Sequence, residues 1–346
     1  MDNIASVKRY HVAKVYRRDQ PAVQKGRMRE FFQCDFDIAG DYDPMIPDAE
    51  IIRIINEVFT ELDIGEYTIK INHRKILDGL FEVCGVPHQK VRSISSAVDK
   101  LDKLPWEQVK QEMIETKGLP EEVADRIHEY VQLKGIFPKY FSDSGGPELL
   151  EKLQEDKRLL ANESASQGLQ EMSLLFNYLD ALNSAKTVSP QMMFLTQVSF
   201  DLSLARGLDY YTGLIFEVVT SASAPPPPPS TIVTNATKEG SKKKPANPDE
   251  DISESVGVGS ICGGGRYDDL VGRFAGESRQ IPCVGMSVGI ERVFAILRAK
   301  KLAEGVRGSA TQVYVMGMGD VGVETRLAIV KELWEAGIQV LHITCI

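Results

Sequence analysis

The chain has 346 residues, of which 43% are hydrophobic and 26% are charged. This size and composition allow a large buried core, which excludes wholesale disorder and favours one large domain or two ordinary ones. Lys and Arg number 40 and Asp and Glu number 49, and the resulting net charge of −9 excludes a polybasic protein of the histone kind. A local basic patch remains possible. The sequence contains no run of 18 apolar residues, so we expect no membrane span.

The N-terminus and the cysteines bear on the cellular compartment. Residues 1–15 lack the apolar core of a secretory signal. The five cysteines lie far apart and form no CxxC motif, which argues against a disulfide framework and against a zinc–thiolate site. We therefore predict a cytoplasmic protein. Because the chain begins abruptly, a mitochondrial location stays open.

The first predicted element is a β-hairpin. Residues 7–16 and 30–38 are rich in aromatic and β-branched residues, which is typical of strands. The connection over residues 17–29 contains Pro21 and Gly26, which favour turns. We expect the two strands to pair across this long loop.

A helix and another strand follow the hairpin. Asp48 opens the helix, whose wide apolar face continues to residue 62. A strand at 67–72 and a helix around residue 80 come next. From about 90 to 190 the signals are almost entirely helical, so we predict a helical insertion between two sheet-forming halves.

Strands return at 197–204 and 211–219 before the pattern breaks again. Residues 221–256 contain five consecutive prolines and a lysine-rich stretch, which indicates a disordered surface insertion. Residues 256–275 have the pattern of a strand edge and a glycine-rich turn. Residues 282–297 have the pattern of a strand that runs into a helix.

The C-terminal residues 306–346 have the pattern of the beginning of a second domain. Strands at 311–316 and 338–343 flank a helix at about 321–336, which makes a βαβ unit. Two parallel strands and one helix do not bury both faces of a sheet. We therefore expect a chain truncated at both ends, whose main domain covers residues 1–305.

The loop of the first hairpin gives the strongest local signal for a binding site. Its cations, set against the single acid Asp19, are Arg17, Arg18, Lys25, Arg27 and Arg29. Five cations at one hairpin tip suit a polyphosphate or the phosphates of a nucleic-acid end. A solvated turn that keeps a sheet edge soluble is an equal alternative.

Polar residues on the strand after this loop share one face. Gln33, Asp35 and Asp37 alternate along the strand, so their side chains point the same way. Two acids and an amide beside a cationic loop suit an ammonium group. The wet side of a half-exposed strand carries similar residues, so both interpretations stay open.

A second motif, SLARGLDYYTG, combines a cation with two phenols. Arg206 supplies a permanent positive charge, and Tyr210 and Tyr211 point to opposite faces if the chain is extended. The alternative is purely structural, with the tyrosines in the core and a surface ion pair between Arg206 and Asp209.

Two further motifs contain glycine and arginine. Residues 263–265 let the backbone approach a ligand closely, and we expect Arg266 and Tyr267 to line that ligand. Taken alone this signal is weak, because glycine-rich turns are common. In GMSVGIERVF, Arg292 lies either over a nucleotide or on the surface of the first helical turn.

Together these segments resemble the class II aminoacyl-tRNA synthetases, and among them the eukaryotic-type histidyl-tRNA synthetases. The resemblance covers nearly all of the chain. It rests on VYRRDQPAVQKGRMREFFQCDFDIAG (the second class motif), DPMIPDAE, LARGLDYYTG, GGRYD and GMSVGIERVF (the third class motif). It implies an α+β fold, in which an antiparallel-sheet class II catalytic core with a helical insertion precedes the start of an α/β anticodon-binding domain.

For ATP, the resemblance implies four arginines. Arg17 clamps the α-phosphate, Arg27 contacts the outer phosphates, and Arg292 lies at the adenine and the phosphates. Arg206 is implied as a catalytic arginine that takes a metal-like role at the α-phosphate. It also counts among the histidine-binding residues.

For histidine, the resemblance implies an amide, an acid and three phenols. Gln33 and Asp37 hold the α-amino group, Tyr211 reads the imidazole, and Tyr210 and Tyr267 line its pocket. The implied reaction joins L-histidine and ATP into histidyl-adenylate and then transfers histidine to the 3′ end of tRNA(His). Mg²⁺ is expected on the ATP phosphates.

The implied partners and the alternatives complete the expectation. The family is expected to form a homodimer, although the first class motif that builds its interface lies upstream of this chain. One alternative is an inactive synthetase-like paralogue or fragment that binds tRNA or a protein; another is the regulatory subunit of histidine biosynthesis. The enzyme is favoured because the chain retains Arg17, Gln33, Asp37, Arg206, Tyr211 and Arg292.

Overall fold

In the computed structural model of the chain, the described residues are 6–18, 28–137, 145–183, 198–207, 209–220, 259–275, 280–303, 310–317, 319 and 321–342. The chain forms two compact units, residues 1–296 and 297–346. Arg27 and the predicted insertion at 221–256 lie outside the described residues.

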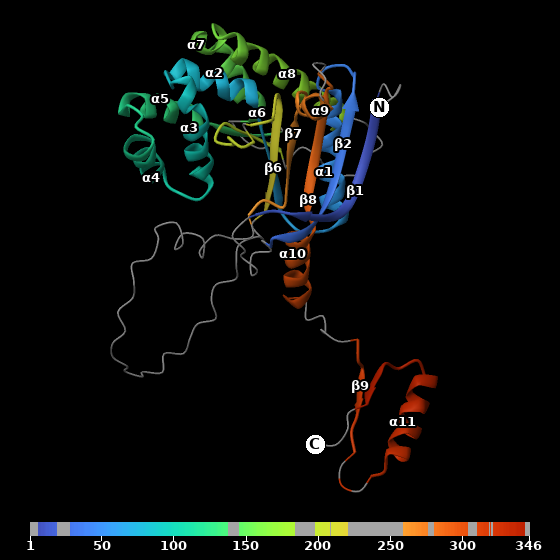
Figure 1. Cartoon of the computed structure of the whole chain (residues 1–346). Coiled ribbons are helices and arrows are strands. Elements are labelled where there is room, and N and C mark those ends of the chain that lie inside the picture. The colour runs from blue at the N-terminus through green and yellow to red at the C-terminus, as the bar shows by residue number, and fades with distance from the viewer. Residues whose placement is uncertain are drawn as a thin grey trace, which may run out of the picture. The chain divides into compact units, whose positions relative to one another are not determined.

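The first unit is built on a sheet of eight strands in the order β1-β2-β8-β7-β6-β3-β5-β4 (Figure 1). In chain order they are β1 (Ser6–Tyr16), β2 (Glu30–Gly40), β3 (Tyr67–His73), β4 (Lys134–Phe137), β5 (Val198–Asp201), β6 (Leu214–Thr220), β7 (Cys262–Arg266) and β8 (Cys283–Gly289). All neighbouring strands are antiparallel except β3 and β5, which are parallel. The predicted α+β fold is confirmed, with one parallel pair in an otherwise antiparallel sheet.

The predicted hairpin is confirmed as β1 and β2. Their register runs from Ser6 opposite Gly40 to Tyr16 opposite Glu30, and the Arg17 amide donates to the Arg29 carbonyl at 2.9 Å. The other edge of β2 pairs with β8, so the segments that carry two of the sequence motifs lie side by side (Figure 1).

Nine α-helices lie within the described part of the first unit, and a tenth, α10, crosses its C-terminal boundary. They are α1 (Ile46–Glu61), α2 (Arg74–Cys84), α3 (Val91–Val98), α4 (Trp106–Gln111), α5 (Glu121–Val131), α6 (Gly146–Glu155), α7 (Lys157–Leu160), α8 (Glu163–Asn183), α9 (Leu270–Ala275) and α10 (Ile290–Ala303). The region from about 90 to 190 is mainly helical, as predicted, but β4 was missed. This strand pairs with β5, and its four residues are too few to show a strand period.

Helix α1 supports the sheet through the apolar stripe seen in the sequence. Ile51, Ile52, Ile55 and Phe59 are at most 1% exposed, and each such side chain contributes roughly 1.5–3 kcal/mol by burial. The helix begins at Ile46, two residues before the predicted start, because Pro47 fits a first helical turn. Asp48 therefore lies inside this turn, where its side chain is fully buried.

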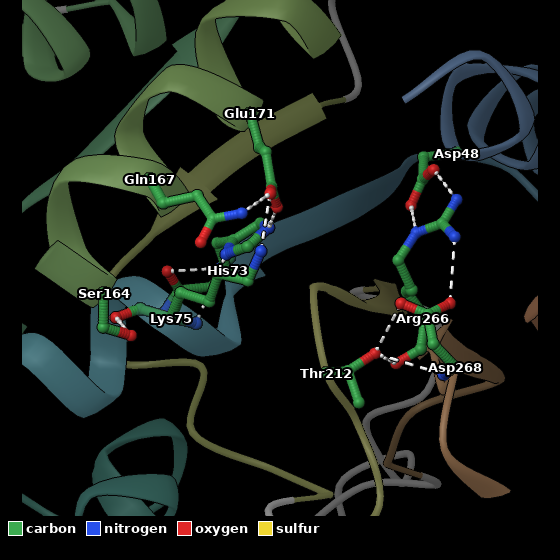
Figure 2. Close-up of polar contacts among 10 residues, drawn as sticks. Asp48, His73, Lys75, Ser164, Gln167, Glu171, Thr212, Arg266 and Asp268 are labelled. Atoms are coloured by element: carbon green, nitrogen blue, oxygen red, sulfur yellow. Dashed lines mark hydrogen bonds and ion pairs between the residues drawn. The ribbon is translucent and has the colours of Figure 1, made fainter. Parts of the chain in front are cut away.

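A buried polar cluster joins the end of β3 to α8 (Figure 2). The fully buried His73 accepts the Lys75 amide at Nδ1 (3.3 Å), and its Nε2 lies 2.8 Å from Glu171 Oε2. Lys75 Nζ donates to Glu171 Oε1 at 2.6 Å, and Gln167 donates to the same oxygen at 3.0 Å. Burial alone raises the pKa of Glu171, but His73 and Lys75 outweigh it and lower the pKa to about 2.

We expect Glu171→Gln to lower the free energy of unfolding by about 2 kcal/mol at pH 7, because the variant loses the carboxylate that His73 and Lys75 stabilise. The folded pKa of about 2 lies below the ordinary 4.5, so this stabilisation is complete above pH 4.5 and disappears as the pH falls towards 2. Urea unfolding at pH 7, 4.5 and 3 measures both effects. Glu163→Gln, at the exposed start of the same helix, is the matched control. Equal losses in the two variants would contradict the assignment.

The second unit contains the predicted βαβ motif. Strands β9 (Val313–Val315) and β10 (Val340–His342) pair in parallel, and α11 (Val323–Glu335) connects them. The division between the two compact units falls at residues 296/297, within α10, and the boundary at 305/306 stays a prediction. Among the described helices, none combines the length and apolar character needed to cross a bilayer.

Candidate active site

A cavity of about 380 Å³ lies in the first unit, on the sheet face formed by β2, β8 and β7. The wall is completed by Arg206, Gly207, Tyr210 and Tyr211 from the loop before β6 and by the first turn of α10. Residues predicted from separate motifs meet here: Arg17, Gln33, Arg206, Tyr210, Tyr211 and Arg292. Segments more than 250 positions apart in the sequence thus contribute to one concave surface, which is the usual form of a small-molecule site.

Strand register explains which residues face the cavity. Gln33 lies opposite Gly289, and Asp35 lies opposite Ser287, whose hydroxyl donates to the Asp35 carboxylate. Asp37 lies opposite Gly285. Opposed residues of antiparallel strands share a sheet face, so the predicted common face of Gln33, Asp35 and Asp37 agrees with this register.

The glycines of β7 and β8 make room on this face. A Cβ on Gly285 would lie 2.2 Å from Asp37 Oδ1, and a Cβ on Gly265 would lie 2.5 Å from the Leu214 carbonyl and 3.0 Å from the Tyr211 ring. The predicted glycine-rich turn at 263–265 is therefore wrong. These residues form the central strand β7, and glycine is needed there for space rather than for a turn.

Arg206 is held at the cavity by groups from two other segments. Its Nη1 lies 2.7 Å from Glu217 Oε2 of β6 and donates to Ser260 Oγ at 3.4 Å. Burial alone lowers the pKa of Arg206, but Glu217 and Asp99 outweigh it and raise the pKa above its ordinary value. The alternative surface pair between Arg206 and Asp209 is wrong, because Asp209 pairs with Arg92 at 2.8 Å.

Two further guanidinium groups reach the same cavity. Arg17 lies over the Phe31 ring, 5.2 Å from its centroid, and Arg292 donates to the Ser260 carbonyl. With Arg206 they make three cations, against two acids of the wall, Asp99 and Glu291. Arg206 is also paired with Glu217. Guanidinium groups that converge from three segments suit an anionic ligand.

Tyr210 and Tyr211 both line the cavity, so the expectation that they point to opposite faces is wrong. Their amides donate to the Gly207 carbonyl at 3.3 and 3.1 Å, which closes a turn where the sequence pattern had suggested a strand. The two rings lie 4.3 Å apart. Burial, assisted by Tyr210, raises the pKa of Tyr211, so its phenol stays neutral and offers both a donor and an acceptor.

Asp37 and Tyr267 form a pair outside the cavity wall that the described residues make. The Tyr267 hydroxyl donates to Asp37 Oδ1, and Arg9 Nε lies 3.5 Å from Asp37 Oδ2. Burial, with the Asp37 carboxylate, raises the pKa of Tyr267. The prediction that Arg266 lines a ligand is wrong, because its guanidinium turns towards Asp48 and Asp268.

Some wall residues were not found from the sequence. Phe31 and Glu291 lie within motifs but had no assigned role, and Ser260 precedes the glycine run without a signal of its own. Asp99 comes from the predicted helical insertion, in the short turn after α3. Only the three-dimensional arrangement brings it to Arg206. Within the described residues, no group of three or more His, Cys, Asp or Glu side chains gathers as a metal site.

Comparisons with known proteins point to one family. The family model for histidyl-tRNA synthetase matches residues 3–226. The histidine–tRNA ligase of Danio rerio is 49% identical over 341 residues, covering 98% of this chain and 60% of that protein. The mitochondrial histidine–tRNA ligase of Saccharomyces cerevisiae is 49% identical over 353 residues, covering 99% of this chain and 59% of that protein. The chain thus spans about 60% of the length of these curated relatives.

A solved structure agrees with the sequence comparisons. The crystal structure of histidyl-tRNA synthetase from Nostoc sp. PCC 7120 is 28% identical, with a TM-score of 0.61. The match covers 99% of this chain and 66% of that one. The relatives include proteins named mitochondrial and cytoplasmic, the two compartments that the sequence left open.

Proposed function

Because this chain belongs to the histidyl-tRNA synthetase family, we propose that it activates L-histidine with ATP and transfers it to the 3′ end of tRNA(His). The observation that carries the proposal is the meeting of three arginines and two tyrosines at one cavity. A wall with guanidinium groups beside phenols matches a substrate pair in which one partner is a polyphosphate and the other carries an imidazole.

The ATP side of the proposal rests on Arg17, Arg206 and Arg292. Attack of the histidine carboxylate on the α-phosphorus forms the P–O bond of the adenylate and releases pyrophosphate. Negative charge on the phosphoryl oxygens is stabilised by guanidinium groups that are already fixed in place. Arg206 meets this need because Glu217 and Ser260 hold it and it stays protonated at any working pH. Mg²⁺ would be expected with ATP, where it would add positive charge at the phosphates.

The histidine side rests on Gln33, Tyr210 and Tyr211 at the cavity and on the adjoining Asp37–Tyr267 pair. The Gln33 amide oxygen and the Asp37 carboxylate are acceptors for the α-ammonium group. A neutral imidazole has one donor and one acceptor nitrogen, and a phenol complements either. A site built from such groups rejects apolar amino acids, because they would leave its buried polar atoms unpaired.

tRNA(His) and a second copy of the chain are the proposed macromolecular partners. Both partners are expected because the chain belongs to this family, and the dimer stays a prediction. The same holds for the second unit as the start of an anticodon-binding domain. Its β9–α11–β10 unit is the expected beginning of an α/β fold.

The test is ATP–pyrophosphate exchange with histidine and, separately, with each other amino acid. We expect exchange with histidine alone, because only this side chain offers the imidazole that the tyrosines complement. Exchange with several amino acids would overturn the specificity. No exchange from a chain with a cooperative melting transition would overturn catalysis by this chain and favour the alternative, a synthetase-like binding module.

A further inference from the structure

A polar network joins three segments of the first unit, and none of its members lines the cavity described above (Figure 2). It consists of Asp48 in α1, Thr212 before β6, Arg266 at the end of β7, and Asp268 just after it; we call it the Arg266 network. Asp48 is fully buried, and both of its carboxylate oxygens accept from Arg266, Oδ1 from Nε at 3.1 Å and Oδ2 from Nη2. This is the bidentate fork that a guanidinium forms best.

The network continues from Arg266 to the loop that carries the tyrosines. Arg266 Nη1 donates to Asp268 Oδ1 at 3.0 Å, and Asp268 Oδ2 accepts the Thr212 hydroxyl at 3.0 Å. Asp268 Oδ1 also accepts the Cys283 amide at 3.0 Å, at the start of β8. The Thr212 amide donates to the Arg266 carbonyl at 2.8 Å. One carboxylate thereby joins the tyrosine loop, β7 and β8.

The network places one guanidinium between two carboxylates. Burial alone lowers the pKa of Arg266, but Asp48 and Asp268 outweigh it and raise the pKa above its ordinary value. A guanidinium with two carboxylates around it has a fixed direction, since all of its hydrogen bonds must be satisfied together. The network is therefore a rigid support rather than a surface ion pair.

Two of the phenols assigned to histidine are attached directly to this support. Tyr211 precedes Thr212, and Tyr267 lies between Arg266 and Asp268. The loop also packs closely on the arginine, because a Cβ on Gly213 would lie 2.9 Å from Arg266 Cδ. The arginines of the ATP side have other supports: Glu217 and Ser260 hold Arg206, and Phe31 underlies Arg17.

We infer that the Arg266 network positions Tyr211 and Tyr267, and that it therefore sets affinity for histidine without setting affinity for ATP. Its members are positioning residues, since Asp48 and Arg266 act through the backbone and side chains of their neighbours. The inference rests on the proposed function, because it takes the tyrosines to be the histidine-binding end of the cavity. It explains why Arg266 turns away from the ligand that the sequence pattern had given it.

Thr212 offers the sharpest test, because it has two conservative replacements. Thr212→Val keeps the shape of the side chain and removes the hydroxyl that Asp268 accepts, whereas Thr212→Ser keeps the hydroxyl. We expect Thr212→Val to weaken histidine binding about tenfold or more, because the hydroxyl donates to the Asp268 carboxylate and also accepts the Asp268 amide. Thr212→Ser should restore most of that affinity. Calorimetric titration with histidine alone, and with ATP alone, measures the two constants, and ATP binding should change less than about twofold.

A control threonine lies at the end of β6, the strand that follows Thr212. Thr220 is buried and donates through its hydroxyl to the Glu66 carbonyl, so Thr220→Val also removes a hydrogen-bonded hydroxyl. It should leave the histidine constant unchanged. Melting temperatures of all variants reveal any that do not fold, and Asp268→Asn then serves as a second break in the network.

The outcomes separate the two claims. If the parental chain binds histidine and Thr212→Val binds it as tightly as Thr212→Ser, the positioning role is wrong and the proposed function stands. Equal weakening of histidine and ATP binding would also overturn it, since a general loosening of the fold would be the cause. If the parental chain does not bind histidine, the proposed function fails and this inference fails with it.

Discussion

Arg206→Ala is expected to lower the rate of histidine-dependent ATP–pyrophosphate exchange by about 10²- to 10³-fold, while the Kd for ATP changes little. In the proposed reaction the guanidinium stabilises charge that develops at the α-phosphorus, and removal of one such preorganised donor typically costs 10²- to 10³-fold. The charge is present in the ground state too, but there Arg17 and Arg292 share it. Steady-state exchange and equilibrium ATP titration measure the two quantities separately.

Two variants control this experiment. Arg206→Lys keeps a positive charge but loses the planar fork, so we expect activity between that of Arg206→Ala and the parental chain. Arg92→Ala removes an arginine whose side chain is 78% exposed and which pairs with Asp209 in the neighbouring loop, so exchange should be nearly unchanged. Near-normal exchange by a folded Arg206→Ala chain would remove the role proposed for this residue.

Asp48→Ala is expected to lower the free energy of unfolding by about 3–5 kcal/mol, the loss typical when one partner of a buried ion pair is removed. The carboxylate is fully buried, and its loss leaves Arg266, whose side chain is only 15% exposed, without its bidentate partner. Urea unfolding followed by circular dichroism measures the difference.

The neighbouring acid of α1 supplies the matched control. Glu50 pairs with Lys8 at 2.6 Å, but the two side chains are 36% and 45% exposed, so Glu50→Ala should cost less than about 1 kcal/mol. The double variant Asp48→Leu with Arg266→Met should be more stable than Asp48→Ala, because no guanidinium is left without its bidentate partner, and Asp268 still accepts from the Thr212 hydroxyl and the Cys283 amide. Similar losses for Asp48→Ala and Glu50→Ala would show that the buried pair does not stabilise the fold.

Local pattern was sufficient for most of the secondary structure. The alternation in residues 7–16 and 30–38 predicted β1 and β2, and the apolar stripe after Asp48 predicted α1. In both cases residues close together in the sequence form the pattern that predicts the element. β4 was missed because it is a short strand whose stability comes from its partner β5.

The candidate site was predicted as a set of residues but not as an arrangement. The motifs identified Arg17, Gln33, Arg206 and Tyr211, because the residue types themselves indicate what they can bind. The direction of the Arg266 side chain could not be predicted, because it depends on Asp48, which lies 218 positions away in the sequence.

The same reasoning applies to the glycines and to Asp99. Residues 263–265 look like a turn in isolation, and only their pairing between β6 and β8 shows that they clear space for Asp37 and Tyr211. Asp99 approaches Arg206 through the packing of the helical region on the sheet, an interaction that no local period encodes.

The position of β8 in the sheet also orders the events of folding. In the described sheet, the β1–β2 hairpin pairs with the other strands only through β8. Strand β2, which contains Gln33, therefore gains its second neighbour only after Gly289 of β8 has been synthesised. A free two-stranded ribbon is marginally stable in water, and closing a loop of some 250 residues is slow. On the ribosome, the segment with Arg17 and Gln33 is therefore made early and fixed late. The cavity wall is completed only when β8 has emerged, because Ser287 and Gly289 belong to that wall.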